Sequence, residues 1–430
     1  MNVKKEIKRG YKMTKLGWIP VEWEVIGLKG VCAKLINGGT PSRKKTEYWN
    51  GTIPWISGAD ILNQEVSAIR RRITKEAIEN SSTNLIKKGD ILIVTRTGVG
   101  KLAIAPFDIC ISQDFTGVIP NLDIINTEFL FIFLDFSIPK LKCLNQGTSI
   151  NGITRDVLIK HKIPLPPLPE QKKIAQILST WDRAIHTLER LISKKQELKK
   201  GLMQVLLTGK VRFGEFVVEE GMRETKLGWL PRDWEVKRLS EIAEIKGGKR
   251  IPKGKSLSDE KTPYPYIRVA DMFNGGVKIN QVKYVPEDVF PIISRYTISE
   301  KDIFITVAGT LGIVGTVPAS LDGANLTENA DKLTNLLCDR DYLLFVLMSS
   351  IVQKHIKAEQ TSNAQPKLAL TRIRKFFIPY PSLKEQKRIS TLIIKIQKEI
   401  DFLENEFSCF QTQKKGLMQK LLTGEVRVKV

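Results

Sequence analysis

Histidine and cysteine are scarce in this chain, and neither is arranged for metal binding. The 430 residues include three histidines, which are isolated from one another, and five cysteines, which lie far apart without C-x-x-C spacing. Zinc and redox sites need such clusters, so we expect no metal in this chain and reduced thiols, as in a cytosolic protein. These residues are His161, His186, His355, Cys32, Cys110, Cys143, Cys338 and Cys409.

Long apolar runs are also missing. The longest, at 129–134 and 342–348, are too short to span a bilayer. The first residues, MNVKKEIKRGYK, lack the apolar core of a signal peptide. These absences predict a cytoplasmic protein with no membrane partner.

Acidic residues are too few to balance the basic ones. The chain has 68 Lys and Arg against 46 Asp and Glu, which gives a net charge of +22. Because this surplus is spread along the whole chain rather than held in a tail, it favours binding to a long polyanion, DNA or RNA. A basic surface that is merely solvated is the alternative that composition leaves open.

What the sequence does have is an internal repeat. KKGLMQVLLTGKVR at 199–212 returns as KKGLMQKLLTGEVR at 414–427, and TKLGWIPVEWEV at 14–25 returns as TKLGWLPRDWEV at 225–236. A single repeat at half the chain length predicts a pseudo-dimer in one polypeptide, with internal pseudo-twofold symmetry. Between these anchors the halves differ almost everywhere, so one scaffold is expected to carry two different surfaces.

The first part of each half has the pattern of a compact, β-rich α/β (α+β) domain. The β-type runs DILIVT (90–95) and DIFITV (302–307) alternate with glycine-rich turns, and a single apolar helix follows each. The tryptophans of the repeated TKLGW segments are expected in the core or in domain-to-helix packing. The predicted division is two globular domains, 1–165 and 214–380, and two helical segments, 166–213 and 381–430.

The two helical segments are predicted to pair as an antiparallel coiled coil. Each starts after a proline-rich break and has apolar residues at alternating spacings of four and three, an a/d repeat. Each would contain about 37 residues and span about 55 Å, ending at a Thr-Gly pair. Two amphipathic helices that pack separately on their own domains are the alternative. The predicted seam is Ile174, Leu178, Trp181, Ile185, Leu188, Ile192, Ile389, Ile393, Ile396, Ile400, Leu403 and Phe407, interrupted by Lys195, Lys199 and Lys414.

Together these segments resemble the specificity subunit of a Type I restriction–modification enzyme. The resemblance is carried by LPPLPEQKKIAQIL (165–178), YPSLKEQKRISTLI (380–393), the paired KKGLMQ-x-LLTG-x-VR exits and the paired TKLGW[IL]P-x-x-W segments. It covers the whole chain in the family's order of variable domain, conserved helix, variable domain and conserved helix.

The resemblance implies a DNA sequence-recognition subunit. Each β-rich domain would be a target recognition domain that reads one half of a bipartite site in double-stranded DNA. The helices would set the spacing and dock two adenine-N6 methyltransferase (modification) subunits, and a translocase and nuclease (restriction) subunit would join to cut foreign DNA such as that of phage. The cofactors implied are S-adenosylmethionine for the modification partner and ATP with Mg for the restriction partner, with none in this chain.

The residues agree that the chain is not itself an enzyme. An adenine methyltransferase needs a small polar residue before Pro-Pro-aromatic and a glycine-rich cofactor loop. The Pro166-Pro167 pair is preceded by Leu165 and not by a small polar residue, and it is followed by Leu168 and not by an aromatic residue. The Gly38-Gly39 and Gly247-Gly248 pairs do not continue as G-x-G-x-x-G. TGVGK at 97–101 fails the phosphate-loop spacing, because Leu102 follows the lysine.

Three loops recur at corresponding places in the two halves and offer donors, acceptors and cations for DNA. They are 38–45 with 247–253, 95–98 with 307–310, and 146–151 with 360–365. The run Arg70-Arg71-Arg72 is interpreted as phosphate-facing or merely solvated. The predicted DNA-binding residues are Gly39, Thr40, Ser42, Arg43, Lys44, Lys45, Arg96, Thr97, Lys101, Gln146, Thr148, Ser149, Asn151, Lys249, Arg250, Lys253, Lys255, Thr310, Gln360, Thr361, Ser362, Asn363 and Gln365.

Two other functions fit parts of these observations. One is a stand-alone coiled-coil adaptor that binds nucleic acid without a methyltransferase partner. The other is the recognition half of a larger fused methyltransferase–endonuclease, which would place the missing catalytic motifs in the same chain. A neighbouring gene that encodes Asn-Pro-Pro-aromatic would favour the specificity subunit over the adaptor.

Overall fold

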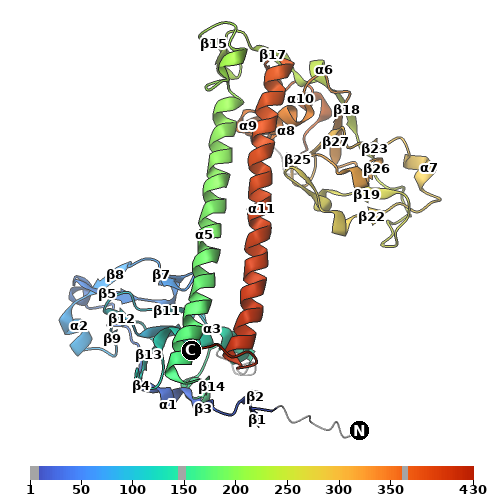
Figure 1. Cartoon of the computed structure of the whole chain (residues 1–430). Helices are drawn as coiled ribbons and strands as arrows, with labels where there is room; N and C mark the ends of the chain where they lie inside the picture. The colour runs from blue at the N-terminus through green and yellow to red at the C-terminus, as the bar shows by residue number, and fades with distance from the viewer. Residues whose placement is uncertain (1–8, 144–151, 361–366) are drawn as a thin grey trace, which may run out of the picture. The chain divides into compact units, whose positions relative to one another are not determined.

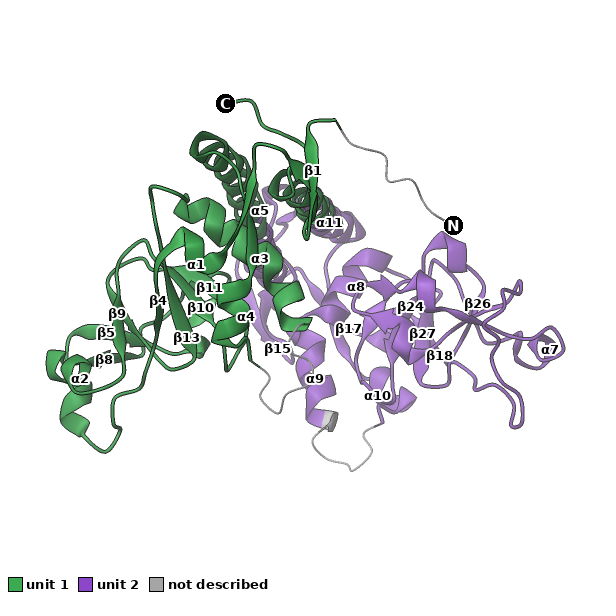
Figure 2. Cartoon of the chain, turned by 90° about the horizontal axis from the view of Figure 1, so that it is seen from below, with its two compact units in different colours: residues 1–189, 405–430 green, residues 190–404 purple. Residues whose placement is uncertain are grey.

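The computed structural model describes residues 9–143, 152–360 and 367–430 (Figure 1). The chain divides into two compact units, one formed by Met1–Glu189 with Asn405–Val430 and the other by Arg190–Glu404 (Figure 2). Both boundaries fall inside long helices, so each unit holds one β-rich domain and a part of each helix. In the described part of the chain, no helix is long and apolar enough to cross a membrane.

Unit 1 is built around two four-stranded sheets, ordered β11-β10-β13-β4 and β8-β5-β12-β9. All neighbours are antiparallel except β5 and β12. Strand β10 is buried on both faces: Ile91 and Ile93 join one apolar cluster and Leu92 and Val94 another, as the period of two in a strand requires. The strands are β4 (Cys32–Asn37), β5 (Ile53–Ile56), β8 (Arg71–Ile73), β9 (Asn84–Ile86), β10 (Ile91–Val94), β11 (Leu102–Ile104), β12 (Ile109–Ile111) and β13 (Phe115–Pro120).

Unit 2 repeats this topology strand for strand. Its sheets are ordered β25-β24-β27-β18 and β22-β19-β26-β23, with β19 and β26 parallel. The predicted internal repeat of two β-rich α/β domains is therefore confirmed. The strands are β18 (Glu244–Gly247), β19 (Pro265–Ile267), β22 (Lys283–Tyr284), β23 (Thr297–Ile298), β24 (Ile303–Thr306), β25 (Val314–Gly315), β26 (Ala324–Leu326) and β27 (Ala330–Thr334).

The apolar helix expected in each half is present, but in unit 2 it is interrupted. Unit 1 has α3 (Thr127–Cys143), whereas unit 2 has α8 (Arg340–Met348) followed by α9 (Ser350–Gln360). The expectation of one helix was wrong there because Ser349 leaves the helical conformation. Its hydroxyl donates to Val346 O and accepts from Ile351 N, as serine commonly does at the start of a helix.

A two-stranded ladder ends each domain just before its long helix. In unit 1, β3 (Glu24–Gly27) pairs with β14 (Lys162–Leu165), and in unit 2, β17 (Glu235–Arg238) pairs with β28 (Phe377–Tyr380). The helices that follow are α5 (Leu168–Leu206), of 39 residues, and α11 (Leu383–Leu422), of 40 residues. Their lengths agree with the sequence pattern.

The two long helices pack against each other in both units, and in opposite directions. In unit 1, the rings of Trp181 and Phe410 meet edge to face with centroids 5.3 Å apart, and Lys414 pairs with Asp182. In unit 2, Lys195 Nζ lies 2.6 Å from Glu399 Oε2, and Lys199 donates to Gln397. The three lysines that interrupt the apolar seam therefore each find a polar partner on the facing helix.

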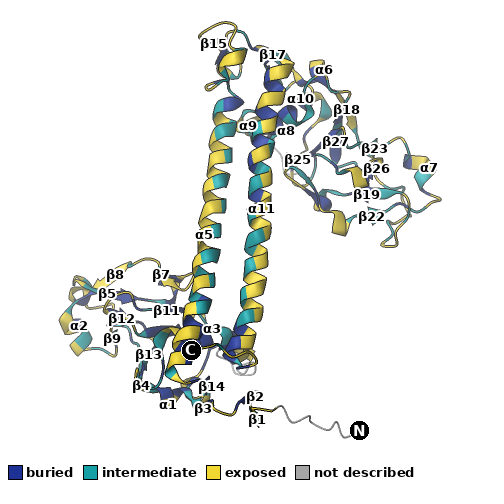
Figure 3. Ribbon diagram, viewed as in Figure 1, coloured by how far each residue is buried: buried dark blue, intermediate teal, exposed yellow. Residues whose placement is uncertain are grey.

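The predicted seam faces inward along its whole length. Six of its twelve residues are buried and the other six half-buried, and none is exposed. Figure 3 shows burial deepest where the helices meet the domains. The predicted alternative, in which each helix packs separately on its own domain, does not match these contacts.

A buried carboxylate at the start of each long helix joins that helix to the last residues of the repeat. In unit 1, Glu170 accepts from Trp23 Nε1 and from the Arg427 guanidinium. In unit 2, Glu385 accepts from Trp234 Nε1 and from Arg212 in the same way. We call these two clusters the helix-end junctions.

Trp23 and Trp234 are almost completely buried, as the sequence predicted, but Trp229 is not. The Trp229 side chain is 60% exposed on β16 (Gly228–Pro231), so the expectation of core packing was wrong for this residue. Its strand belongs to a two-stranded ladder with β15 (Met222–Thr225), and a two-stranded ladder leaves side chains accessible to solvent.

Candidate nucleic-acid interface

The first predicted loop of unit 1 is held against the sheets by its glycines. Gly38 N donates to Phe115 O at 3.1 Å, Gly39 N donates to Ile111 O at 2.9 Å, and Trp55 Nε1 donates to Gly39 O at 3.1 Å. A Cβ atom on Gly38 would lie 2.1 Å from Ser112 O. Glycine is thus required here for close approach to the protein's own backbone.

The corresponding loop of unit 2 is anchored in the same way. Gly248 N donates to Ala330 O at 3.0 Å, Lys249 N donates to Leu326 O at 2.8 Å, and Tyr266 OH donates to Lys249 O at 2.8 Å. A Cβ on Gly248 would lie 2.0 Å from a backbone oxygen. An aromatic donor from corresponding strands, β5 and β19, therefore fixes the loop in each domain.

Beyond this common anchor the loops of the two domains differ in charge. In unit 1, Ser42, Arg43 and Lys44 are exposed. Thr40 donates to Gln113, and Lys45 Nζ donates to Tyr48 OH at 2.9 Å. The loop thus presents two exposed cations next to each other.

In unit 2 most loop cations meet acidic or aromatic groups. Arg250 donates to Glu328 at 2.5 Å, and this hydrogen bond raises the pKa of Arg250. Lys255 pairs with Asp288, whose pKa is lowered mainly by that bond. Lys249 Nζ lies 5.7 Å from the centroid of the Tyr296 ring, and Lys253 is exposed.

The second predicted loop is divided between surface and interior. Arg96 and Thr97 of unit 1 and Thr310 of unit 2 are exposed. Lys101, by contrast, donates to the backbone oxygens of Gly58 and Ile61, at 3.0 Å each. These bonds direct its ammonium group into the domain and away from the surface on which the other residues lie.

The third predicted loop pair lies almost entirely outside the described residues. Gln360 is the last residue of α9. The remaining predictions there are outside the described ranges: Gln146, Thr148, Ser149, Asn151, Thr361, Ser362, Asn363 and Gln365.

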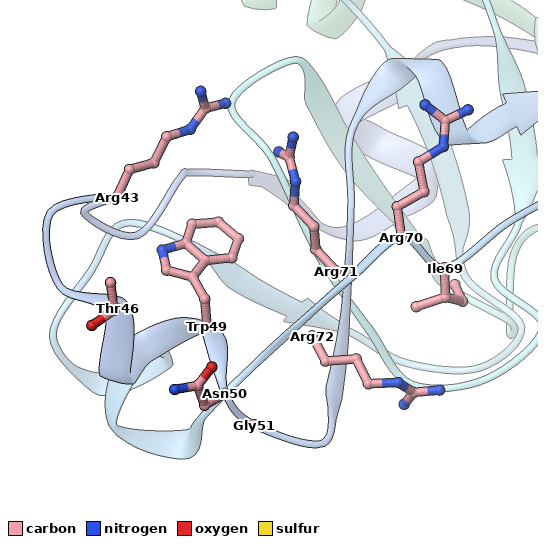
Figure 4. Close-up of a pocket in the computed structure, with 9 residues that line it drawn as sticks. All are labelled: Arg43, Thr46, Trp49, Asn50, Gly51, Ile69, Arg70, Arg71 and Arg72. Atoms are coloured by element: carbon pink, nitrogen blue, oxygen red, sulfur yellow. The ribbon is translucent and has the colours of Figure 1, made fainter.

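An open cavity on unit 1 adjoins the first loop. The sequence did not predict this cavity. It measures about 840 Å³, and Arg43, Trp49, Arg70, Arg71 and Arg72 contribute to its lining (Figure 4). We call it the arginine cavity. The sequence signals were Arg43, a predicted DNA-binding residue, and the Arg70-Arg71-Arg72 run; Trp49, which completes the lining, comes from another segment.

An apolar groove lies on the helices of unit 2. It measures about 690 Å³ and is lined by Leu191, Ile394, Phe402 and Leu403, with lysines beside them. Leu191, Leu198 and Phe402 have exposed side chains. No group of three or more His, Cys, Asp or Glu side chains that could hold a metal occurs among the described residues.

Two β-rich domains with the same topology and different basic loops, carried on paired helices, define a two-part recognition protein. The family model for the Type I restriction modification DNA specificity domain matches the chain twice, over residues 20–200 and 231–407. The chain belongs to this family, and is the DNA-recognising, non-catalytic specificity subunit of a Type I restriction–modification enzyme.

Individual relatives span nearly the whole chain. The specificity subunit of the Type I restriction enzyme MjaIX from Methanocaldococcus jannaschii is 26% identical over 97% of this chain and 96% of its own length. The crystal structure of the Type I S subunit from M. genitalium aligns with a TM-score of 0.57 at 18% identity, covering 93% of this chain and 96% of that one. A chain from a study of complex assembly and conformational transition of the type I R-M system aligns with a TM-score of 0.56 at 18% identity, covering 95% of this chain and 99% of that one. These likenesses support the fold described above.

Proposed function

We propose that each β-rich domain reads one half of a bipartite sequence in double-stranded DNA. The observation that carries this proposal is the common loop anchor followed by different side chains. Trp55 and Tyr266 hold corresponding loop carbonyls in the two domains. The exposed side chains that follow differ in identity and pairing. Because sequence is read by side-chain contacts with base edges, one scaffold with two different loops suits two different half-sites.

The recognition domains of this proposal are residues 1–165 and 214–380. The loops at 38–45 and 247–253, with Arg96, Thr97 and Thr310, would approach the DNA. Arg43, Lys44 and Lys253 are exposed cations, which suits contact with phosphates or guanine.

The helical segments 166–213 and 381–430 would act as the spacer and as the docking surface for two adenine-N6 methyltransferase subunits. The apolar groove of unit 2 supports the docking role. Exposed side chains such as Leu191 and Phe402 are not needed for the helix pair itself, and contiguous apolar surface is typical of protein interaction sites.

The reactions would take place on the partner subunits. S-adenosylmethionine would bind to the modification subunits, and ATP with Mg to the restriction subunits that join for cleavage. The role of this chain would be to bring a chosen adenine to the methyltransferase, which must extrude its target base from the duplex.

Methylome sequencing tests the proposal directly. The chain is expressed with its modification partner in a host that lacks adenine methylation, and methylated adenines are mapped. We expect a split, asymmetric sequence with an unread gap. Replacing residues 25–162 with those of a homologous domain should change one half-site and leave the other intact. A continuous site, or a change in both halves, would contradict the assignment.

Binding by the chain alone separates this function from a stand-alone adaptor. Because its apolar helix surface is left uncovered without partners, we expect the chain to bind duplex DNA poorly or to aggregate unless it is co-expressed with the modification subunits. Tight, sequence-specific binding by the lone chain at physiological salt would favour the adaptor.

A further inference from the structure

We propose that the arginine cavity of unit 1 is a DNA phosphate-binding site, an anchor on the backbone that the second domain lacks. This inference rests on the proposed function, because it assigns a role within the DNA-binding surface of the first domain. It assigns Arg43 and Arg71 to affinity and leaves the reading of sequence to the other exposed residues of the loops.

Two tryptophans organise the cavity. The rings of Trp49 and Trp55 meet edge to face, with centroids 5.1 Å apart and planes at 86°. Trp49 Nε1 donates to Ser42 O at 3.2 Å, and Trp55 Nε1 donates to Gly39 O at 3.1 Å. Both rings are thereby tied to the loop that carries Arg43.

Arg71 is held over these rings. Its guanidinium carbon lies 5.6 Å from the Trp55 centroid and 6.0 Å from the Trp49 centroid, within the range of cation–π attraction. Arg71 opens β8, which is the outer strand of its sheet. In Figure 4 the guanidinium groups of Arg43, Arg70 and Arg71 extend toward the same side, whereas Arg72 extends away from them.

Two of the four arginines already have protein partners. Arg70 Nε lies 3.1 Å from Oδ1 of the buried Asp60, and Arg72 Nη1 donates to Thr52 O at 2.8 Å. Within the described residues, neither Arg43 nor Arg71 forms an ion pair with a carboxylate. These two guanidinium groups therefore keep donors available for a ligand.

The gathering of guanidinium groups favours a phosphate over a base. One guanine edge offers two acceptors and satisfies one arginine. A phosphate carries a negative charge and several acceptor oxygens, so it can receive hydrogen bonds from two arginines and reduce their mutual repulsion. The rigid aromatic support also limits the side-chain entropy that Arg71 loses on binding.

The corresponding strand of unit 2 carries a cation that is already paired. Strand β22, which corresponds to β8, carries Lys283, whose ammonium lies 3.0 Å from Asp259. Beside it, the rings of Tyr264 and Phe290 stack with centroids 3.7 Å apart. With Arg250 and Lys255 also paired to carboxylates, the second domain has no counterpart of the arginine cavity among its described residues.

The salt dependence of DNA binding tests the site. The complex with its modification subunits is titrated with a labelled duplex that carries the wild-type target, at several salt concentrations. Each phosphate contact contributes about 0.9 to the slope of log K against log salt. Because both arginines are assigned to one phosphate, the double variant Arg43→Ala/Arg71→Ala should reduce the magnitude of the slope by about 0.9, with the methylated sequence unchanged.

The matched control removes two charges from the same domain without touching the cavity. Lys29 and Lys88 are exposed, and Lys29→Ala/Lys88→Ala should keep the wild-type slope. The single variant Arg43→Ala leaves the Arg71 stack intact and should lower the magnitude of the slope by less than the double variant, which guards against misfolding of the double variant.

The outcomes distinguish this site from the proposed function. If the wild-type complex methylates a split site but the cavity variants behave like the lysine control, the phosphate site is refuted and the function stands. A changed first half-site in the variants would show that these arginines read bases, which also overturns the inference. If the wild-type complex recognises no split sequence, the proposed function itself fails.

Discussion

Glu170 and Arg427 lie 257 residues apart in the sequence and form a two-bond ion pair. Arg427 Nε donates to Oε1 at 2.6 Å, and Nη2 donates to Oε2 at 2.9 Å. The equivalent pair, Glu385 with Arg212, has bonds of 2.9 Å each. Because each arginine follows one long helix and each glutamate begins the other, these junctions bring the end of one repeat to the start of the next helix.

The two junctions should differ in energy. Each arginine also bonds a second carboxylate, Asp233 for Arg212 and Glu22 for Arg427, but the Arg212 side chain is 8% exposed and the Arg427 side chain 38%. Removing one partner of a buried pair costs about 3–5 kcal/mol. We expect Arg212→Ala to lower the free energy of unfolding by this amount and Arg427→Ala by less, as measured by urea denaturation. The control Arg388→Ala breaks an exposed pair with Glu215 and should cost less than about 1 kcal/mol. Equal effects at both junctions would contradict this ranking.

The helix seam should control assembly and not sequence choice. Ile400 is 2% exposed, and truncating a buried isoleucine to alanine costs about 2–5 kcal/mol. Ile400→Ala, or Trp181→Ala, should weaken assembly with the modification subunits, measured by size-exclusion chromatography, while any remaining methylation stays on the wild-type sequence. Lys194→Ala, at an exposed position of α5 off the seam, is the control. An altered target with intact assembly would refute the structural role.

Asp331 should make unit 2 less stable as pH rises. Burial raises the pKa of this carboxyl to about 6, although the nearby Lys367 opposes the shift. The folded form therefore retains a proton that the unfolded chain loses near its ordinary value of 3.8, and stability falls between about pH 4 and pH 6. Asp331→Asn should stabilise the protein at pH 7 by roughly 3 kcal/mol, with no gain below about pH 4.

Asp322, a carboxyl whose pKa is shifted in the opposite direction, serves as the control for this pH dependence. The pKa of Asp322 is lowered mainly by a hydrogen bond from the backbone N–H of Glu300. Asp322→Asn should therefore destabilise the protein at neutral pH, and this effect should disappear as the pH falls through the acidic range. Thermal unfolding of both variants and of the wild type from about pH 2 to pH 8 gives the comparison. A flat pH profile for the difference between Asp331→Asn and wild type would show that burial does not perturb this group.

Helix length should set the gap between the half-sites. Four residues inserted between Gln176 and Lys194 add about 6 Å to α5, close to two base-pair steps, and nearly one helical turn, which keeps the apolar face roughly aligned. Methylome sequencing should then show a changed gap and two unchanged half-sites. The same insertion between Glu220 and Gly221, which are exposed and outside the helices, is the control. An unchanged gap with full activity would show that the length of the helices does not set the distance between the half-sites.

The sequence by itself determined the repeat, the two β-rich domains and the two long helices. These features depend on local sequence patterns: the apolar β-type run at Ile91–Val94 and the spacing from Ile174 to Ile192 can each be recognised in a short stretch of the chain. Even the lysines that interrupt the seam could be identified, although their partners could not.

Only the tertiary structure decided how individual polar groups are used. Lys101 donates to the backbone carbonyls of Gly58 and Ile61, which lie 43 and 40 residues before it in the sequence. The charge of Arg250 is paired with that of Glu328. Arg71 gains its support from Trp49 and Trp55. Each of these pairings joins separate segments, and the charge that a side chain presents to DNA depends on such neighbours and not on its own position in the chain.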